Sequence, residues 1–236
     1  MRTKNLLRLW VALTLVVVAN GETVSGPVPA APKTFTRTLY LVRHGAYDTR
    51  KKETQESVQS LTMLGLAQAR LVADRLHGLP VAFSSFTASP VTRARQTAEI
   101  VHQSLPQLEL QFEPLLAECT PPTWREDIMK GEKAESLAAA EQQLNAAFAK
   151  YFVPAEGGDR QDLMVCHANV IRYFVVKALG VDPRAWLGFS VPHCSITIIR
   201  VKADGTFRVF AVGDVGHIPP NLQSGIGQPD PDLVLP

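Results

Sequence analysis

One short run of residues constrains the fold more than any other feature of this sequence. Residues 39–42, Leu-Tyr-Leu-Val, have the high strand propensity of a buried β-strand and lead directly into Arg43, His44 and Gly45. Such a strand fixes the positions of the arginine and the histidine, while the glycine permits a tight turn and the close approach of a ligand. A neutral histidine is a competent nucleophile at physiological pH, and a guanidinium group suits phosphate. The end of this strand is therefore the first candidate functional turn.

The same pattern recurs in the second half of the chain. Residues 163–166 form another short apolar run, which leads into His167 and then into an almost wholly apolar segment that ends at Gly180. Two buried strands that each deliver a histidine at the same end match the geometry of open α/β sheets, whose sites lie at the carboxyl ends of the strands. We therefore expect the two histidines to meet at one edge of a sheet.

Predicted helices and strands alternate along the rest of the chain. A helix follows a strand over 81–85, with Ser89 as its expected cap and Pro90 at its first position. It has Arg93 in its first turn, where free amide groups and the helix dipole attract anions. This order predicts a three-layer α/β sandwich with a mostly parallel central sheet and helices on both faces. The predicted helices cover 62–78, 90–104, 132–152 and 168–179, and further strands cover 108–112, 195–202 and 206–212.

Composition excludes some classes of function and leaves the redox state open. The 236 residues suffice for one α/β domain with a large core. A net charge of +2, with no basic run interleaved with aromatic residues, argues against nucleic acid as a partner. Three cysteines form a poor disulfide framework; two of them could pair, or all could be small buried side chains. They are Cys119, Cys166 and Cys194.

The first 21 residues have the pattern of a secretory signal peptide. Arg2, Lys4 and Arg8 precede an apolar run over 9–19, and small and polar residues follow. The apolar run is shorter than the roughly 20 residues of a membrane span, so we expect cleavage and no stable membrane span, with an uncleaved anchor as the alternative. The protein would then be exported, periplasmic or secreted. The expected organisation is a signal peptide over 1–21, a linker over 22–37, a folded domain over 38–220 and a flexible tail over 221–236.

Four motifs in a fixed order carry a resemblance to one enzyme family. With them the chain resembles the histidine phosphatase superfamily, in its phosphoglycerate mutase-like branch, over most of its length from about Thr38 to Ile218. Further residues, among them the stretch 166–173, are similar to the mitochondrial serine/threonine protein phosphatases of the phosphoglycerate mutase family. The four motifs are Leu41-Val42-Arg43-His44-Gly45, Leu61-Thr62-x-x-Gly65-x-x-Gln68-Ala69, Ser89-x-x-x-Arg93-x-x-Gln96-Thr97-Ala98 and His167-Ala168.

The resemblance implies a metal-independent phosphomonoester hydrolase that works through a phosphohistidine. His44 would be the nucleophile, and Arg43, Arg93 and His167 would grip the phosphoryl oxygens, with His167 protonated when phosphate binds. The substrate would be a phosphorylated small molecule or protein, with phosphoserine or phosphothreonine in proteins as the finer hypothesis. The alternatives are phosphoglycerate mutase-type phosphoryl transfer and a non-catalytic scaffold that binds a phosphorylated ligand.

The remaining site residues are assigned less directly. By resemblance Glu118 takes the position of the general acid, with Glu113 as the fallback, and Asn169 lines the phosphate pocket. His193 could border the mouth of the pocket. No metal and no cofactor are expected, because no close pair of histidines or cluster of carboxylates has ligand spacing along the sequence. A homodimer is left open.

Overall fold

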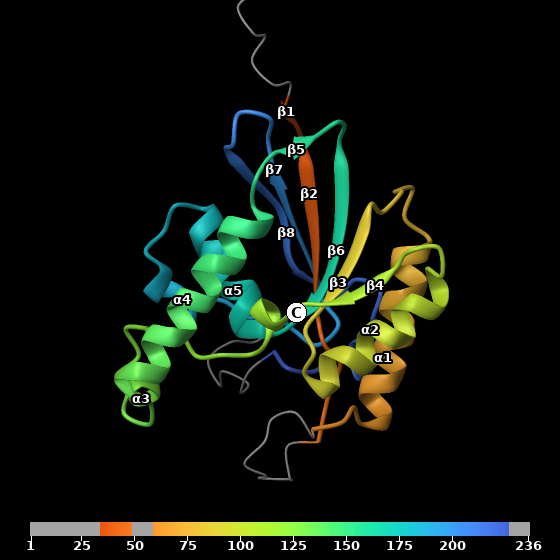
Figure 1. Cartoon of the computed structure of the whole chain (residues 1–236). Coiled ribbons are helices and arrows are strands. Elements are labelled where there is room, and N and C mark those ends of the chain that lie inside the picture. Colours follow the sequence, from red (N-terminus) through yellow and green to blue (C-terminus); the bar gives the residue numbers. More distant parts are fainter. Residues whose placement is uncertain (1–33, 49–58, 227–236) are drawn as a thin grey trace, which may run out of the picture. The chain divides into compact units, whose positions relative to one another are not determined.

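A computed structural model describes residues 34–48 and 59–226, and a six-stranded sheet runs through this part of the chain (Figure 1). The strand order is β4-β3-β6-β2-β7-β8. Neighbours from β4 to β2 pair in parallel, whereas β7 and β8 form an antiparallel hairpin at one edge, so the sheet is mixed. The six strands are β2 (Arg37–Arg43), β3 (Ser85–Ala88), β4 (Leu110–Phe112), β6 (Arg160–Cys166), β7 (Ile196–Val201) and β8 (Phe207–Asp214), and a separate two-stranded pair consists of β1 (Thr34–Phe35) and β5 (Ala155–Glu156).

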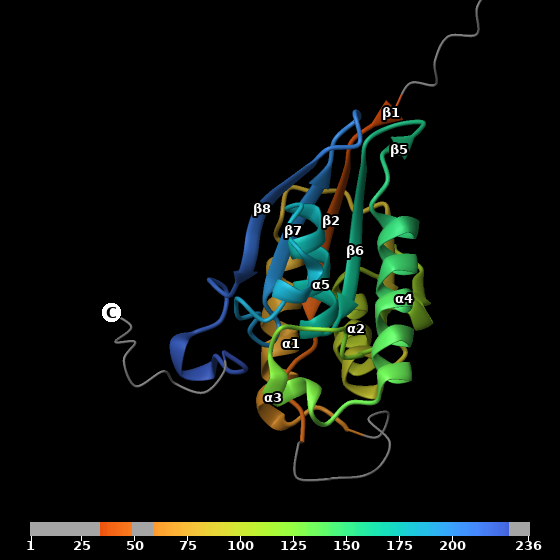
Figure 2. The ribbon, with the colours of Figure 1, turned by 90° about the vertical axis from the view of Figure 1, so that its left-hand side faces the viewer.

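Helices cover both faces of this sheet, as Figures 1 and 2 show. Tyr40 and Val42 of β2 pack against α1 and α2, whereas Leu39 and Leu41 face α4 and α5. This alternation follows from the two-residue period of a strand and gives each face its own apolar core. The predicted three-layer α/β sandwich is confirmed. The helices are α1 (Met63–His77), α2 (Thr92–Ser104), α3 (Glu126–Met129), α4 (Ala134–Tyr151) and α5 (Ala168–Ala178), with 3₁₀ turns at Pro114–Leu116, Pro183–Ala185 and Pro220–Leu222.

The central pair of strands sets the position of the site. β2 and β6 pair in parallel with Arg43 opposite Cys166. The next residues, His44 and His167, therefore leave the sheet side by side at its carboxyl edge. The backbone continues this pairing, because the His44 amide donates to the carbonyl oxygen of Cys166 at 3.0 Å.

Local signals predicted α1 better than the strand that follows it. α1 begins after Thr62, whose side chain accepts a hydrogen bond from the Gly65 amide, and Gly78 caps its end. The predicted strand over 81–85 is wrong, because β3 covers Ser85–Ala88 instead. The apolar run there does not fix its own register; pairing with β6, which places Ser85 opposite Asp162, decides it.

Strand residues and hydrogen bonds extend past both ends of the expected folded domain, 38–220. The signal peptide over 1–21 and most of the linker over 22–37 lie outside the described residues, but residues 34–35 form β1 and Arg37 begins β2. At the other end, residues 221–226 of the expected flexible tail are hydrogen bonded to the domain, as the contact between the His193 amide and the Ser224 carbonyl at 2.9 Å illustrates. Within 34–48 and 59–226, no helix has the length and apolar character that crossing a membrane requires.

Candidate active site

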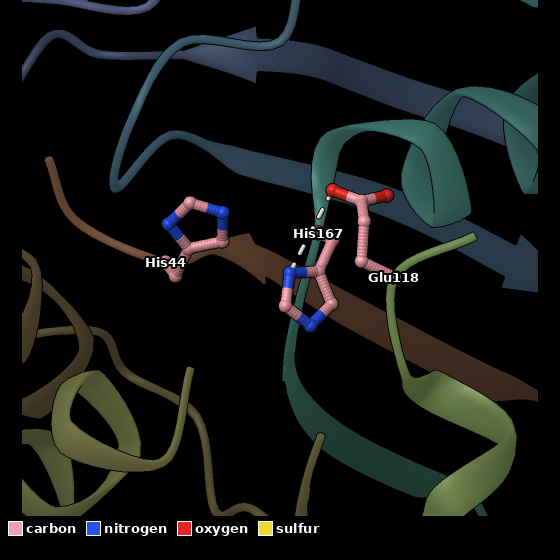
Figure 3. Close-up of side chains that lie close together, drawn as sticks. All are labelled: His44, Glu118 and His167. Carbon is pink, nitrogen blue, oxygen red and sulfur yellow. Dashed lines mark ion pairs between the residues drawn. The ribbon is translucent and has the colours of Figure 1, made fainter. Parts of the chain in front are cut away.

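Two histidine rings lie next to each other at the carboxyl edge of the sheet (Figure 3). Their centroids are 5.1 Å apart, and both side chains are buried. His44 Nδ1 lies 2.8 Å from the Gly45 carbonyl oxygen, which can only accept, so this nitrogen carries the proton. Arg93 Nε donates to the other ring nitrogen, Nε2, at 3.2 Å. The lone pair of His44 Nε2 is therefore fixed on the side of the arginine.

Both histidines are neutral when no ligand is bound. Burial lowers the pKa of His44 well below its usual range, and the nearby His167 and arginines lower it further. Burial likewise lowers the pKa of His167, with Arg93 and Arg43 adding to the effect. A neutral imidazole is the form that can act as a nucleophile, so the environment keeps His44 in its reactive state.

Arg93 enters the site from the start of α2. It is 1% exposed, and its guanidinium carbon lies 4.7 Å from the centroid of the Tyr47 ring. This buried charge faces His44, which places a cation where phosphoryl oxygens would arrive. Ser89, just before α2, has a different role from the predicted helix cap: its Oγ lies 2.8 Å from His167 Nε2, and the N-cap of α2 is Val91.

Glu118 follows the 3₁₀ turn Pro114–Leu116 and points at the histidines (Figure 3). Its Oε2 lies 3.7 Å from His167 Nδ1 and 3.9 Å from Arg93 Nη2, and the side chain is 15% exposed. A carboxyl group that touches both the pocket and solvent can exchange a proton with a leaving group and with water. The fallback acid, Glu113, is elsewhere, because its carboxylate binds Lys150 and accepts from the Tyr151 hydroxyl at 2.9 Å.

A cavity of about 610 Å³ opens over this edge of the sheet. Three arginines line it, Arg43, Arg93 and Arg172, against one carboxylate, that of Glu118. Burial lowers the pKa of Arg43 to about 10, so this group still carries its charge at neutral pH. The excess of positive charge suits a phosphate dianion.

One group of potential metal ligands emerges that the sequence spacing did not predict. Ligand atoms of His44, Glu118 and His167 all lie within 4.8 Å of one another. Arg93 donates directly to His44 and lies near Glu118, so its fixed charge opposes a cation here and favours an anion. A site without metal therefore stays the prediction.

The structure brings the predicted site residues together. Arg43, Arg93, Glu118 and Asn169 line the cavity. His44 and His167 are buried behind this lining, next to Arg93 and Glu118. Asn169 Nδ2 also donates to the Cys119 carbonyl oxygen at 3.2 Å, which ties α5 to the segment after Glu118. Sequence reasoning did not assign several lining or supporting residues, because a single tyrosine or glycine in a polar loop carries no local signal of such a role. Four of them matter most for the geometry of the site. They are Tyr47, Ser89, Arg172 and Gly225.

A neutral histidine next to a pocket lined by arginines, at the carboxyl edge of an α/β sheet, is the arrangement expected of a protein that transfers phosphoryl groups through histidine. The model of the histidine phosphatase superfamily (branch 1) matches residues 39–129 and 120–214. The chain belongs to this superfamily. The predicted superfamily and its fold are confirmed.

Two relatives and one solved structure indicate the range of similarity. The chain is 36% identical over 199 residues to the mitochondrial serine/threonine-protein phosphatase Pgam5 of Caenorhabditis elegans, with 80% of this chain and 66% of the relative covered. It is 32% identical over 220 residues to PGAM5 of Homo sapiens, with 89% of this chain and 75% of the relative covered. A phosphoglycerate mutase from Plasmodium falciparum is similar in structure, with a TM-score of 0.55, 27% identity, and 78% and 95% covered. The chain thus spans about two thirds of the first of these relatives.

The expectation of an exported, periplasmic or secreted protein is wrong. The relatives from Caenorhabditis elegans and Homo sapiens are both named mitochondrial, which points away from export. A basic start followed by an apolar run is not unique to secretory signals, because segments that direct proteins to other membranes share positive charge and apolar residues. The residues concerned, 1–21, lie outside the described part of the chain.

Proposed function

We propose that this protein hydrolyses phosphomonoesters through a phosphohistidine on His44, without a metal ion. The observation that carries the proposal is the orientation of the His44 ring. Nδ1 donates to the Gly45 carbonyl oxygen at 2.8 Å, and Nε2 accepts from Arg93 Nε at 3.2 Å. The lone pair of Nε2 is therefore turned toward an arginine that lines the pocket. A fixed neutral tautomer is what in-line attack on phosphorus requires.

In the first step, Arg93 Nε gives up its hydrogen bond to His44 Nε2 and donates to a phosphoryl oxygen instead. The freed lone pair of Nε2 attacks phosphorus, and the bond to the leaving oxygen breaks. Glu118, in its protonated form, gives its proton to that oxygen, so the product leaves as an alcohol. Arg43 and Arg93 neutralise charge on the equatorial oxygens. The arginines lower the pKa of His167, and the bound phosphate dianion raises it. This histidine therefore gains a proton as phosphate binds.

In the second step, water attacks the phosphohistidine. Glu118, now a carboxylate, takes a proton from the water, the N–P bond breaks, and inorganic phosphate is released. His44 regains its neutral ring, with Nδ1 still bound to the Gly45 carbonyl oxygen. Splitting the displacement in two lets the same carboxyl group act first as acid and then as base.

The finer substrate hypothesis is a protein that carries phosphoserine or phosphothreonine. The names of the two relatives support it, since both are serine/threonine-protein phosphatases. The cavity, about 610 Å³, has room for more than a phosphate group. The expectations that nucleic acid is not a partner and that the chain can form a homodimer stay predictions.

One second candidate has an observation in its favour. The similarity to a phosphoglycerate mutase, at 27% identity, supports phosphoryl transfer back to the product instead of to water. The scaffold alternative is weaker, because a protein that only binds phosphate has no need of a fixed histidine tautomer beside a carboxyl group.

The decisive experiment measures hydrolysis of an aryl phosphate by the full chain in the presence of a chelator. The His44→Ala variant should lose activity by about 10³-fold or more, because the nucleophile is gone. His77→Ala is the matched control, since His77 is exposed at the end of α1, where its Nδ1 lies 3.0 Å from the Ser104 carbonyl oxygen. Activity that survives in His44→Ala, or that the chelator abolishes, would contradict the proposal. Conversion of phosphoglycerate without release of phosphate would favour the mutase.

A mitochondrial location is part of the proposal, supported by the names of the relatives. Fractionation of cells that express the full chain with a C-terminal tag tests it. The tag should follow mitochondrial markers, and its recovery from the medium would contradict this location.

A further inference from the structure

The donors of Arg43 are divided between the protein and the pocket. Nη1 donates to the carbonyl oxygens of Val191 at 2.6 Å and Gly225 at 3.0 Å, and Nη2 donates to His193 Nε2 at 2.9 Å. These contacts use three of the five N–H donors of a guanidinium group. The buried Nε has no hydrogen-bond partner among the described residues. The donors that remain are on the adjacent atoms Nε and Nη2, a pair that can grip two phosphoryl oxygens.

His193 is fixed in one tautomer by its neighbours. Arginine only donates, so His193 Nε2 must accept and Nδ1 must carry the proton. Nδ1 therefore donates to Ser224 Oγ at 3.0 Å. The same hydroxyl oxygen accepts from Gln68 Nε2 at 2.9 Å, and Gln68 Oε1 in turn accepts from the Ala46 amide at 2.9 Å. A continuous chain of hydrogen bonds thus links the turn after His44 to the guanidinium of Arg43.

Gly225 lies too close to Arg43 for any side chain. A Cβ atom there would stand 2.6 Å from Arg43 Nη1 and 2.6 Å from His193 Nδ1, and φ is +74°. The carbonyl oxygen of this residue holds Arg43, and the residue lines the cavity. The segment that contains Gly225 is therefore packed directly against the phosphate-binding group.

We propose that His193, Ser224 and Gly225 are positioning residues that orient Arg43 toward the phosphoryl group of the substrate. His193 and Gly225 contact the guanidinium directly, and Ser224 acts through His193. None of the three is needed to supply charge. By this inference the C-terminal segment that contains Ser224 and Gly225 forms part of the phosphate site. The inference rests on the proposed function only in naming phosphate as the ligand.

The first test compares two glycine variants of the full chain by calorimetric titration with inorganic phosphate. Gly225→Ala should weaken phosphate binding about tenfold, since misalignment forfeits one hydrogen bond to a charged group. Gly205→Ala is the matched control: φ there is +81°, but no atom lies within 4 Å of the added Cβ. It should bind phosphate as the wild type does, although its backbone strain is similar.

The second test uses His193 and remains informative if Gly225→Ala does not fold. His193→Ala removes the acceptor of Arg43 Nη2 and should weaken phosphate binding about tenfold. His193→Gln places an amide oxygen as many bonds from Cα as Nε2, so it should restore affinity to within about threefold of the wild type. A role in stability alone would not distinguish the two variants by their phosphate affinity.

Wild-type affinity in His193→Ala, or equal loss in His193→Ala and His193→Gln, would overturn the inference. So would equal weakening in Gly225→Ala and Gly205→Ala. Phosphate binding does not depend on turnover, so a wild-type protein that binds phosphate but hydrolyses no ester would overturn the proposed function and leave the positioning role standing. Failure of the wild type to bind phosphate would overturn both.

Discussion

Cys194 has a backbone conformation that side chains seldom adopt. Its φ is 52°, and it is the non-glycine residue with positive φ in the described part of the chain. Its amide donates to the carbonyl oxygens of Arg43 at 3.1 Å and His44 at 3.3 Å. A left-handed residue costs of order 1 kcal/mol, which the surrounding contacts must offset. The strained residue therefore follows His193 in the sequence and is hydrogen bonded to the backbone at the end of β2.

The pKa of His193 predicts a loss of stability in mild acid. Burial, together with Arg43 and Arg93, lowers this pKa from 6.5 to about 3 in the folded chain. Between these values the unfolded chain binds more protons than the folded one, so this contribution is present above pH 6.5 and is lost as the pH falls. At pH 5 the loss amounts to about 2 kcal/mol.

Urea unfolding at pH 7.5 and pH 5 checks this prediction. The free energy of unfolding of the wild type should fall by about 2 kcal/mol more than that of His193→Gln, which has no group to titrate there. The other buried histidines are common to both proteins and cancel in the comparison. An equal fall in both proteins would show that His193 keeps an ordinary pKa.

At the scale of elements, the turn after His44 rests on the first turn of α1. A Cβ atom at Gly65 would lie 1.9 Å from the Ala46 carbonyl oxygen, and one at Gly45 would lie 2.6 Å from the Gly65 carbonyl oxygen. The two backbones are therefore in direct contact, which only glycine allows. This contact sets the distance between α1 and the nucleophile.

Gly65→Ala should push α1 and the His44 turn apart. We expect destabilisation of about 3 kcal/mol from overpacking, and loss of activity greater than the loss of folded protein. Gly78→Ala, at the other end of α1, is the control, because its Cβ would meet its nearest atom only at 3.4 Å. Thermal unfolding and aryl phosphate hydrolysis of both variants provide the measurement, and an active Gly65→Ala protein would refute the proposed contact.

Local patterns were sufficient for those elements whose signals are contiguous. The apolar runs before His44 and His167 predicted β2 and β6, and Thr62 and Gly78 marked the ends of α1. β3 was displaced along the sequence because strand register depends on the partner strand, which a local run does not reveal.

The supporting residues of the site depend on tertiary contacts. Ser89 was assigned as a helix cap from its position before Pro90, but it binds His167, which is distant in sequence. Gly225 was placed in a flexible tail because the segment is polar and rich in proline, yet its carbonyl oxygen holds Arg43. The composition of such a segment indicates that it is exposed to solvent, but it does not reveal that one carbonyl group binds Arg43.

At the scale of the whole molecule, the phosphate site is assembled from segments spread along the chain. β2 supplies Arg43, α2 supplies Arg93, the stretch before α3 supplies Glu118, and the C-terminal segment supplies Gly225. Unfolding separates all of them. A ligand held by these groups together binds only the folded chain and must therefore stabilise it as a whole.

Inorganic phosphate should raise the melting temperature of the full chain. At a concentration 100 times its dissociation constant, a ligand adds about 2.7 kcal/mol, or about 5–10 °C for a domain of this size. Arg93→Gln should abolish the shift, because the buried charge beside His44 is lost. Arg95→Gln should retain it, because Arg95 is exposed on the same helix, over the Phe112 ring at 4.9 Å. If both variants kept the full shift, phosphate would be acting on the chain outside this pocket, and the site would have to be sought elsewhere.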